Sequence, residues 1–122
     1  MLITFLDKSH IYDGSTINIK PLDGAEKSLI HLSEALANIG HVVRVYNNCV
    51  ESKVINDVSW NQIKSIDANH SDVWIVHNDP RLFDLVPSNN KKILWLTSSG
   101  LKLARPENFL AAMKHKPTII IQ

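Results

Sequence analysis

A histidine, an asparagine and an aspartate follow one of the apolar runs of this chain. The run covers residues 73–76, and His77, Asn78 and Asp79 come directly after it. An imidazole exchanges protons near neutral pH and can bond to hydroxyl groups. His77 is therefore a candidate catalytic residue, and Asn78 and Asp79 are candidate substrate-binding residues. A structural histidine remains the alternative for His77. Asp79 can also orient His77, but capping a short helix that begins at Pro80 is the favoured interpretation.

A glycine turn precedes the clearest helical pattern, and it gives the second candidate site. Asp23 and Gly24 stand immediately before an amphipathic segment over residues 25–39. Backbone N–H groups and the helix dipole attract anions at a helix N-terminus, and a glycine lets a ligand approach closely. Asp23 and Gly24 are therefore candidate substrate-binding residues, although the charge of Asp23 opposes tight anion binding. In the alternative, Gly24 only forms the turn and Asp23 caps the helix, with Glu26 completing a capping box.

Two serines follow another apolar run and form the third candidate site. Residues 93–96 are followed by Thr97, Ser98, Ser99 and Gly100. Ser98 and Ser99 are candidate substrate-binding residues because their hydroxyls can bond to an acceptor sugar or a phosphate; turn formation is the alternative. No glycine stands on the N-terminal side of these serines, so the pattern is not that of a hydrolase nucleophile.

The histidines and the cysteine do not predict a metal site. The six histidines show neither an HxxxH nor an HExxH spacing, and Cys49 is the only cysteine. A single cysteine excludes an internal disulfide and fits a reducing compartment. Cys49 has no obvious base partner, so an incidental thiol is favoured over a nucleophile.

Short apolar runs predict the strands that position these candidates. Runs rich in valine and isoleucine, without alternation, are typical of strands buried on both faces of a parallel sheet. The predicted strands are residues 2–6, 42–46, 73–76, 93–96 and 118–121. Residues 54–60 are either two short β segments joined by an Asn-Asp turn or one irregular strand.

Two helices are predicted between these strands. The first covers residues 25–39 and ends at Gly40; the second covers residues 106–115, with proline in its first turn. The apolar stripe of the first helix consists of Ala25, Leu29, Leu32, Leu36 and Ile39. The inward-facing residues of the second are Phe109, Leu110 and Met113.

Alternating strands and helices predict an α/β fold with a doubly wound, mainly parallel, Rossmann-like sheet in a single domain over residues 1–122. The first strand is expected in the centre with the second beside it, and ligands are expected at the carboxyl ends of the strands. The chain ends in a predicted strand, so we expect it to be the N-terminal part of a longer two-domain protein.

Residues 21–46 resemble the start of family 4 retaining glycosyltransferases of the GT-B type. Those enzymes carry a Gly-Gly-Ala-Glu-Arg-like turn, a helix and a Gly-His pair before the second strand. This chain has Asp23-Gly24-Ala25-Glu26-Lys27 and Gly40-His41, so Asp23 replaces the first glycine and Lys27 the arginine. His77 matches the place of a histidine that faces the cleft between the two domains of that family.

The resemblance implies a fold, an activity and different roles for two domains. The chain would be the truncated N-terminal, acceptor-side domain of a GT-B enzyme that transfers a sugar from a nucleotide-sugar donor to a glycan or lipid-linked acceptor. It would use no metal and no cofactor besides the donor. The donor nucleotide would be held mainly by the missing C-terminal domain, so the isolated chain is expected to be inactive.

Charge and hydropathy limit the partners and the location. The net charge of +1 gives no case for nucleic acid, whereas residues 91–122 hold six Lys or Arg against one Glu. This excess can favour phosphate-bearing ligands or anionic lipid head groups, but the basic residues form no run, so a solvated surface is the favoured interpretation. No signal peptide or membrane span is evident. We therefore expect a cytoplasmic protein, at most peripheral at the inner membrane face.

Two other functions remain open. The first is a stand-alone flavodoxin-like domain that binds a phosphate or a protein partner. Such a domain would need a complete sheet followed by a C-terminal helix. The second is a fragment of a Rossmann-type oxidoreductase. The missing GxGxxG motif disfavours it, as does the sequence Tyr46-Asn47-Asn48 where an acidic residue would be expected.

Overall fold

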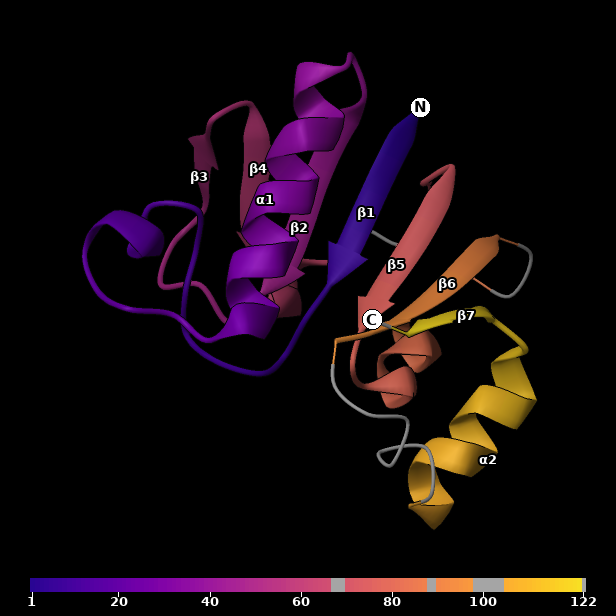
Figure 1. The fold of residues 1–122 in the computed structure, drawn as a ribbon. Helices are drawn as coiled ribbons and strands as arrows, with labels where there is room; N and C mark the ends of the chain where they lie inside the picture. Colours follow the sequence, from indigo (N-terminus) through magenta and orange to yellow (C-terminus); the bar gives the residue numbers. More distant parts are fainter. Residues whose placement is uncertain (67–69, 88–89, 98–104, 122) are drawn as a thin grey trace.

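The computed structural model describes residues 1–66, 70–87, 90–97 and 105–121, and in it a seven-stranded sheet forms the centre of the molecule (Figure 1). The strand order is β3-β4-β2-β1-β5-β6-β7, and all neighbours are parallel except β3 and β4. The strands are β1 (Leu2–Leu6), β2 (Val42–Asn47), β3 (Lys53–Ile55), β4 (Val58–Gln62), β5 (Val73–His77), β6 (Lys91–Leu96) and β7 (Thr118–Ile121). The α/β prediction is confirmed, as is the central position of β1 with β2 beside it.

The helices lie in two groups along the sheet (Figure 1). Helix α1 (Gly24–Asn38) contacts β2 and β4, whereas α2 (Pro106–His115) packs against the 3-10 helix η3 (Pro80–Leu85), which contacts β5. The other 3-10 helices are η1 (Thr16–Asn18) and η2 (Ile63–Ser65). Within the described ranges, no helix combines the length and the apolar character needed to cross a membrane.

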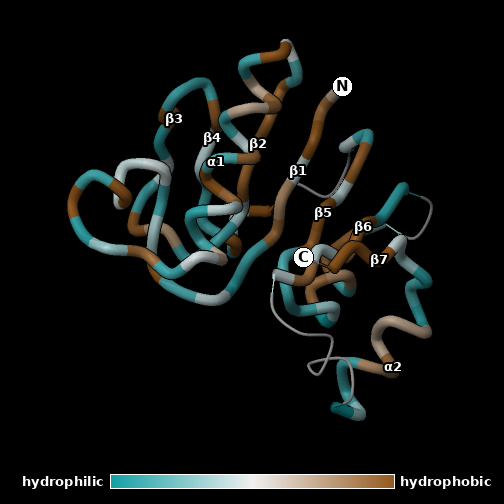
Figure 2. Tube along the Cα trace, in the orientation of Figure 1, coloured by the Kyte–Doolittle hydropathy of each residue, from teal (hydrophilic) through white to brown (hydrophobic). Residues whose placement is uncertain are grey.

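Alternating side chains of the strands build two hydrophobic cores, one on each face of the sheet. Successive residues of a strand point to opposite faces, so β1 places Ile3 and Phe5 in the core with Leu29 of α1, and Leu6 in the core with Phe83 of η3. Figure 2 shows the resulting hydrophobic colour along the central strands and more hydrophilic colour in many of the connections. Burial on both faces explains why the central strands are continuous apolar runs.

Glycine 40 ends α1 as predicted. Its φ of 104° is in the left-handed region, which glycine adopts without steric cost. Gly40 N–H donates to the Ala37 carbonyl at 3.1 Å, and His41 N–H donates to the Leu36 carbonyl at 3.2 Å. These two bonds form a Schellman motif, which satisfies carbonyl groups that the helix end would leave open.

The Asn-Asp turn is also present. Asn56 and Asp57 both have positive φ, at 48° and 65°. A two-residue type I′ hairpin turn requires positive φ at both residues, and its backbone matches the right-handed twist of the strands. The turn joins β3 to β4, so the prediction of two short β segments is confirmed and the single irregular strand is wrong.

The predicted capping box and part of the apolar stripe of α1 are wrong. Asp23 is the N-cap residue, but its side chain makes no capping hydrogen bond. Glu26 bonds to His10 instead of returning to the helix start. The buried residues of α1 include Ile30 and Ser33, whereas Leu32 and Ile39 of the predicted stripe are exposed. The helix is therefore rotated toward the face that contains Glu26.

The expected inward face of α2 is wrong as well. Phe109, Leu110 and Met113 are 54%, 63% and 57% exposed. Asn108 is buried, and the His115 ring lies 5.8 Å from the ring of Phe83 in η3. Asn108 and His115 are seven residues apart and so share one helix face, and this face rather than the apolar one packs against η3.

Candidate ligand-binding site at the carboxyl edge of the sheet

The strand order reverses between β1 and β5. From β1 the chain proceeds to β2 and β4 on one side, then returns to place β5 on the other side of β1. The register pairs Leu6 with Val76, so Asp7, which follows β1, lies beside His77, the last residue of β5. Ligands of open α/β sheets bind at such a switch point, outside the carboxyl ends of the strands.

A cavity of about 190 Å³ lies at this switch point. Residues from the loops after β1 and β5, from η3 and from the start of α2 enclose it. They are Asp7, Lys8, Ser9, His77, Asn78, Asp79, Arg81, Arg105 and Asn108. Of the candidates from sequence, the structure thus brings His77, Asn78 and Asp79 together. Ser98 and Ser99 lie outside the described residues.

His77 is held between a hydroxyl and a carboxylate. It is 1% exposed, and its Nε2 lies 3.1 Å from Thr97 Oγ1. Its Nδ1 lies 3.6 Å from Asp7 Oδ2, beyond hydrogen-bond range, and finds no bonding partner within the described part of the chain. The ring of Trp95 packs against the imidazole at 4.7 Å between centroids. The imidazole is therefore fixed in orientation, with its buried Nδ1 directed at the carboxylate of Asp7.

Asp7 supplies a buried negative charge beside this imidazole. Its Oδ2 accepts hydrogen bonds from the Tyr12 hydroxyl at 2.5 Å and the Ser9 hydroxyl at 3.0 Å. Burial raises the pKa of Asp7, but the interactions with His77 and Tyr12 outweigh it and hold the pKa below its ordinary value. Burial and the charge of Asp7 in turn raise the pKa of Tyr12. Asp7 is thus ionised at neutral pH. Sequence reasoning missed it, although it directly follows a predicted strand.

Asn78 uses its amide to join two strand ends. Its Nδ2 donates to Thr97 Oγ1 at 2.9 Å, and its Oδ1 accepts from the Thr97 N–H at 2.9 Å. Its φ of 66° is in the left-handed region, which asparagine tolerates better than most residues. Both ends of the amide are therefore committed to the protein, so Asn78 shapes the site by holding Thr97 near His77.

Asp79 has the capping role that the sequence favoured. Its Oδ1 accepts from the backbone N–H of Arg81 at 3.1 Å and caps η3. The same carboxylate also bonds to the Arg81 guanidinium, at 3.1 Å and 3.2 Å. Asp79 therefore orients Arg81 at the rim of the cavity and does not contact His77 through these bonds.

Basic side chains from separate elements line the cavity. Lys8 follows β1, Arg81 lies in η3 and Arg105 precedes α2. Asp7 and Asp79 offset part of this charge. Cationic donors around a small polar cavity are suited to phosphate, carboxylate or sugar hydroxyls. His77 forms part of the wall of this cavity, and its side chain is almost fully buried there.

The other two candidates stand elsewhere on the same edge. Asp23 lines a cavity of about 470 Å³ that also contains His10 and Glu26 and shares Ser9 with the cavity of His77. Gly24 is the first residue of α1, and a Cβ built on it would meet no atom within 4 Å. The helix start is therefore open to a ligand, but Asp23 and His77 line different cavities.

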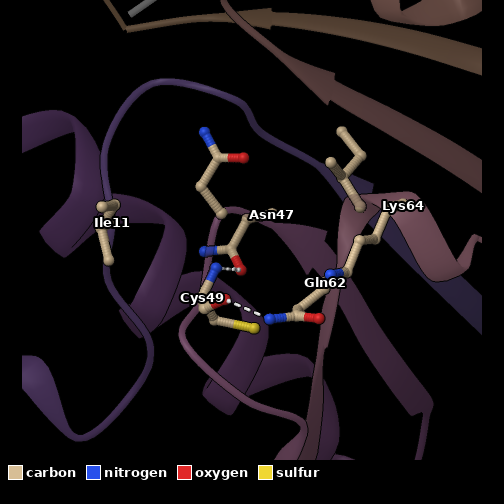
Figure 3. Close-up of a pocket in the computed structure, with 7 residues that line it drawn as sticks. Ile11, Asn47, Cys49, Gln62 and Lys64 are labelled. Carbon is tan, nitrogen blue, oxygen red and sulfur yellow. Dashed lines mark hydrogen bonds between the residues drawn. The ribbon is translucent and has the colours of Figure 1, made fainter.

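A third cavity, of about 420 Å³, lies at the ends of β2 and β4 beside Cys49 (Figure 3). The N–H of Cys49 donates to Asn47 Oδ1 at 3.1 Å, and Gln62 Nε2 donates to the Cys49 carbonyl at 3.3 Å. Burial, followed by the charge of Asp13, raises the pKa of the Cys49 thiol. The thiol therefore stays protonated at neutral pH, which is the reactivity expected of a structural cysteine.

No protein-family model, curated protein or solved structure matches this chain. The fold and the geometry of the carboxyl edge are therefore the basis for any function.

Proposed function

We propose that this domain is the N-terminal, acceptor-side half of a GT-B glycosyltransferase with a doubly wound sheet. The enzyme transfers a sugar from a nucleotide-sugar donor to a glycan or lipid-linked acceptor. The observation that carries the proposal is the cavity at the switch point between β1 and β5, with His77 in its wall and Lys8, Arg81 and Arg105 around it. The sequence of residues 21–46 supports the same family independently.

The cavity residues have distinct tasks in the proposed reaction. Lys8 and Arg105 bind the phosphate of the departing nucleotide or an anionic acceptor, since both line the cavity. His77 is fixed between Thr97 and Asp7 in the wall of the same cavity. Charge placed before the reaction favours the phosphate as it leaves, and a fixed orientation lowers the entropy cost of the transfer.

The start of α1 offers the second contact. A ligand can approach the backbone at Gly24 closely, because the space at its missing Cβ is open. The donor nucleotide is bound mainly by a second domain that closes over this edge. In this proposal the isolated chain holds half of a cleft, so it transfers no sugar and binds nucleotide-sugars weakly. The protein acts in the cytoplasm or at the inner membrane face, where a lipid-linked acceptor is reached, and the transfer uses no cofactor besides the donor.

The basic lining of the cavity also favours a second candidate. A stand-alone flavodoxin-like domain that binds phosphate would use the same cations, Lys8, Arg81 and Arg105. It would recognise the phosphate alone and gain little from a sugar or a nucleoside. The two candidates therefore differ in ligand preference.

Calorimetry with millimolar ligands separates them. The glycosyltransferase half-domain is expected to bind UDP- or GDP-sugars with a dissociation constant on the order of 1 mM, and inorganic phosphate more weakly. Equal affinity for inorganic phosphate would support the flavodoxin-like alternative. Micromolar affinity for a nucleotide-sugar, or transfer of sugar by the isolated chain, would contradict the proposal that this chain holds only half of the cleft.

A further inference from the structure

Three side chains of metal-ligating types meet beside the N-terminus of α1. His10 comes from the loop after β1, Asp23 is the N-cap residue and Glu26 lies in the first turn. One ligand atom from each lies within 4.8 Å of the other two. Twelve residues separate His10 from Asp23, so only the path of the long loop brings them together.

The buried carboxylate of Glu26 points to a cation at this cluster. Glu26 is 2% exposed. Its Oε1 bonds to His10 Nδ1, whereas its Oε2 is buried and has no hydrogen-bond partner in the described ranges. A buried carboxylate oxygen without a partner is costly, because it has lost its water and gained nothing in exchange. The bond to His10 satisfies only one of the two oxygens.

The carboxylate of Asp23 adds a second negative charge at the same place. Asp23 stands at the N-cap, where aspartate ordinarily accepts a hydrogen bond from the helix, yet its side chain makes no such bond. Two carboxylates this close repel each other unless a cation lies between them. A cation bound by both carboxylates would explain why Asp23 and Glu26 lie close together and why the side chain of Asp23 does not cap the helix.

We propose that His10, Asp23 and Glu26 form a binding site for Zn²⁺. One imidazole nitrogen and two carboxylate oxygens are a donor set that zinc accepts, and three protein ligands leave the fourth position open. The same three residues line the cavity of about 470 Å³. Magnesium and calcium prefer oxygen ligands alone.

The zinc ion would fix the loop after β1 to α1. The loop also carries Asp7, Lys8 and Ser9, which line the cavity of His77. The metal therefore stiffens one wall of that cavity without contacting it. The inference goes beyond the proposed sugar transfer, which needs no metal, and neither depends on the other.

Calorimetry of the chelator-treated protein with zinc chloride alone tests the site. One zinc ion per chain is expected, with a rise in melting temperature, because a ligand that binds only the folded state stabilises it. Asp23→Asn and His10→Ala are each expected to weaken zinc binding by about tenfold or more. Both positions are exposed, so these variants should keep the fold, which far-ultraviolet circular dichroism checks.

His41→Ala is the matched control. The N-terminal amine lies 3.2 Å from His41 Nδ1. This amine and this imidazole together could chelate zinc, so they form the competing site. The control is expected to bind zinc like the wild type, and zinc X-ray absorption is expected to show one imidazole. Absence of stoichiometric binding, unchanged affinity in both site variants, loss of binding in His41→Ala, or a spectrum without imidazole would each overturn the proposal.

Discussion

His77 Nδ1 lies 3.6 Å from Asp7 Oδ2 at the point where the strand order of the sheet reverses, and both side chains are 1% exposed. Neither residue is near the other in sequence, so the parallel pairing of β1 with β5 creates their contact. Tyr12 and Ser9 hold the carboxylate, and Thr97 holds the other side of the imidazole. The proposed site depends on this arrangement.

Asp7→Asn should change how stability depends on acid. The pKa of Asp7 is lowered in the folded state, so its contribution to the free energy of unfolding is present above the ordinary pKa and lost as pH falls through the folded pKa. The asparagine variant should be less stable by about 1–3 kcal/mol near neutral pH, with the difference shrinking below about pH 4. Urea unfolding across this range measures it, and a difference that stays constant would contradict the ionised, bonded Asp7.

Asn78→Gly should show the value of the amide that joins β5 to β6. Glycine adopts the positive φ at this position, so the substitution removes both hydrogen bonds to Thr97 without adding strain. The expected loss in the free energy of unfolding is about 1–3 kcal/mol. Asn78→Ala should lose more of the free energy of unfolding, because alanine is also strained in the left-handed backbone conformation. Denaturant titration compares them, and equal stability of Asn78→Ala and the wild type would rule out the constraint.

Gly14→Ala and Gly24→Ala form a matched pair. A Cβ at Gly14 would lie 3.0 Å from Trp60 Nε1 and 3.1 Å from Ile55 Cγ2, whereas a Cβ at Gly24 meets nothing within 4 Å. The first variant should lose about 1–3 kcal/mol through overpacking. The second should be neutral or gain up to about 1 kcal/mol, because alanine restricts the unfolded chain. Thermal melts rank the two, and the reverse ranking would show that Gly14 does not lie against Trp60 and Ile55.

His77→Ala should affect turnover more than folding in a complete transferase that contains this domain. Loss of one hydrogen bond that acts in the transition state corresponds to about 1–3 kcal/mol in kcat/KM. Steady-state kinetics beside thermal melts provide the measurement. A variant that melts far below the wild type but keeps its turnover per folded molecule would show that His77 is a core residue and not part of the site.

The strands were predictable because continuous apolar runs are a local signal, which burial on both faces explains for β1 but not for the exposed β7. The continuous apolar runs gave β1 and β7 with the bounds that the structure has, and the Asn-Asp pair gave the β3–β4 turn. The packing face of α2 was not predictable, because its partner η3 selects Asn108 and His115 over the more apolar side. An apolar stripe shows where a helix can pack, and the partner decides where it does.

The candidate site was predictable only in part. His77 and Asp79 stand directly after a predicted strand, so position alone identified them. Asp7 was missed because its importance comes from the pairing of β1 with β5. The His10, Asp23 and Glu26 cluster has no sequence signal, since its ligands come from a loop and a helix start and follow no fixed spacing.

The most direct test of the central claim is a two-dimensional amide NMR titration of the isolated chain with a nucleotide-sugar. The claim is that the cavity between β1 and β5 binds substrate. Shifts should therefore concentrate at Lys8, Ser9, Asn78 and Arg81, and Lys8→Ala with Arg105→Ala should weaken them. Shifts that cluster at the cavity of Cys49, or that stay unchanged in this double variant, would contradict the account.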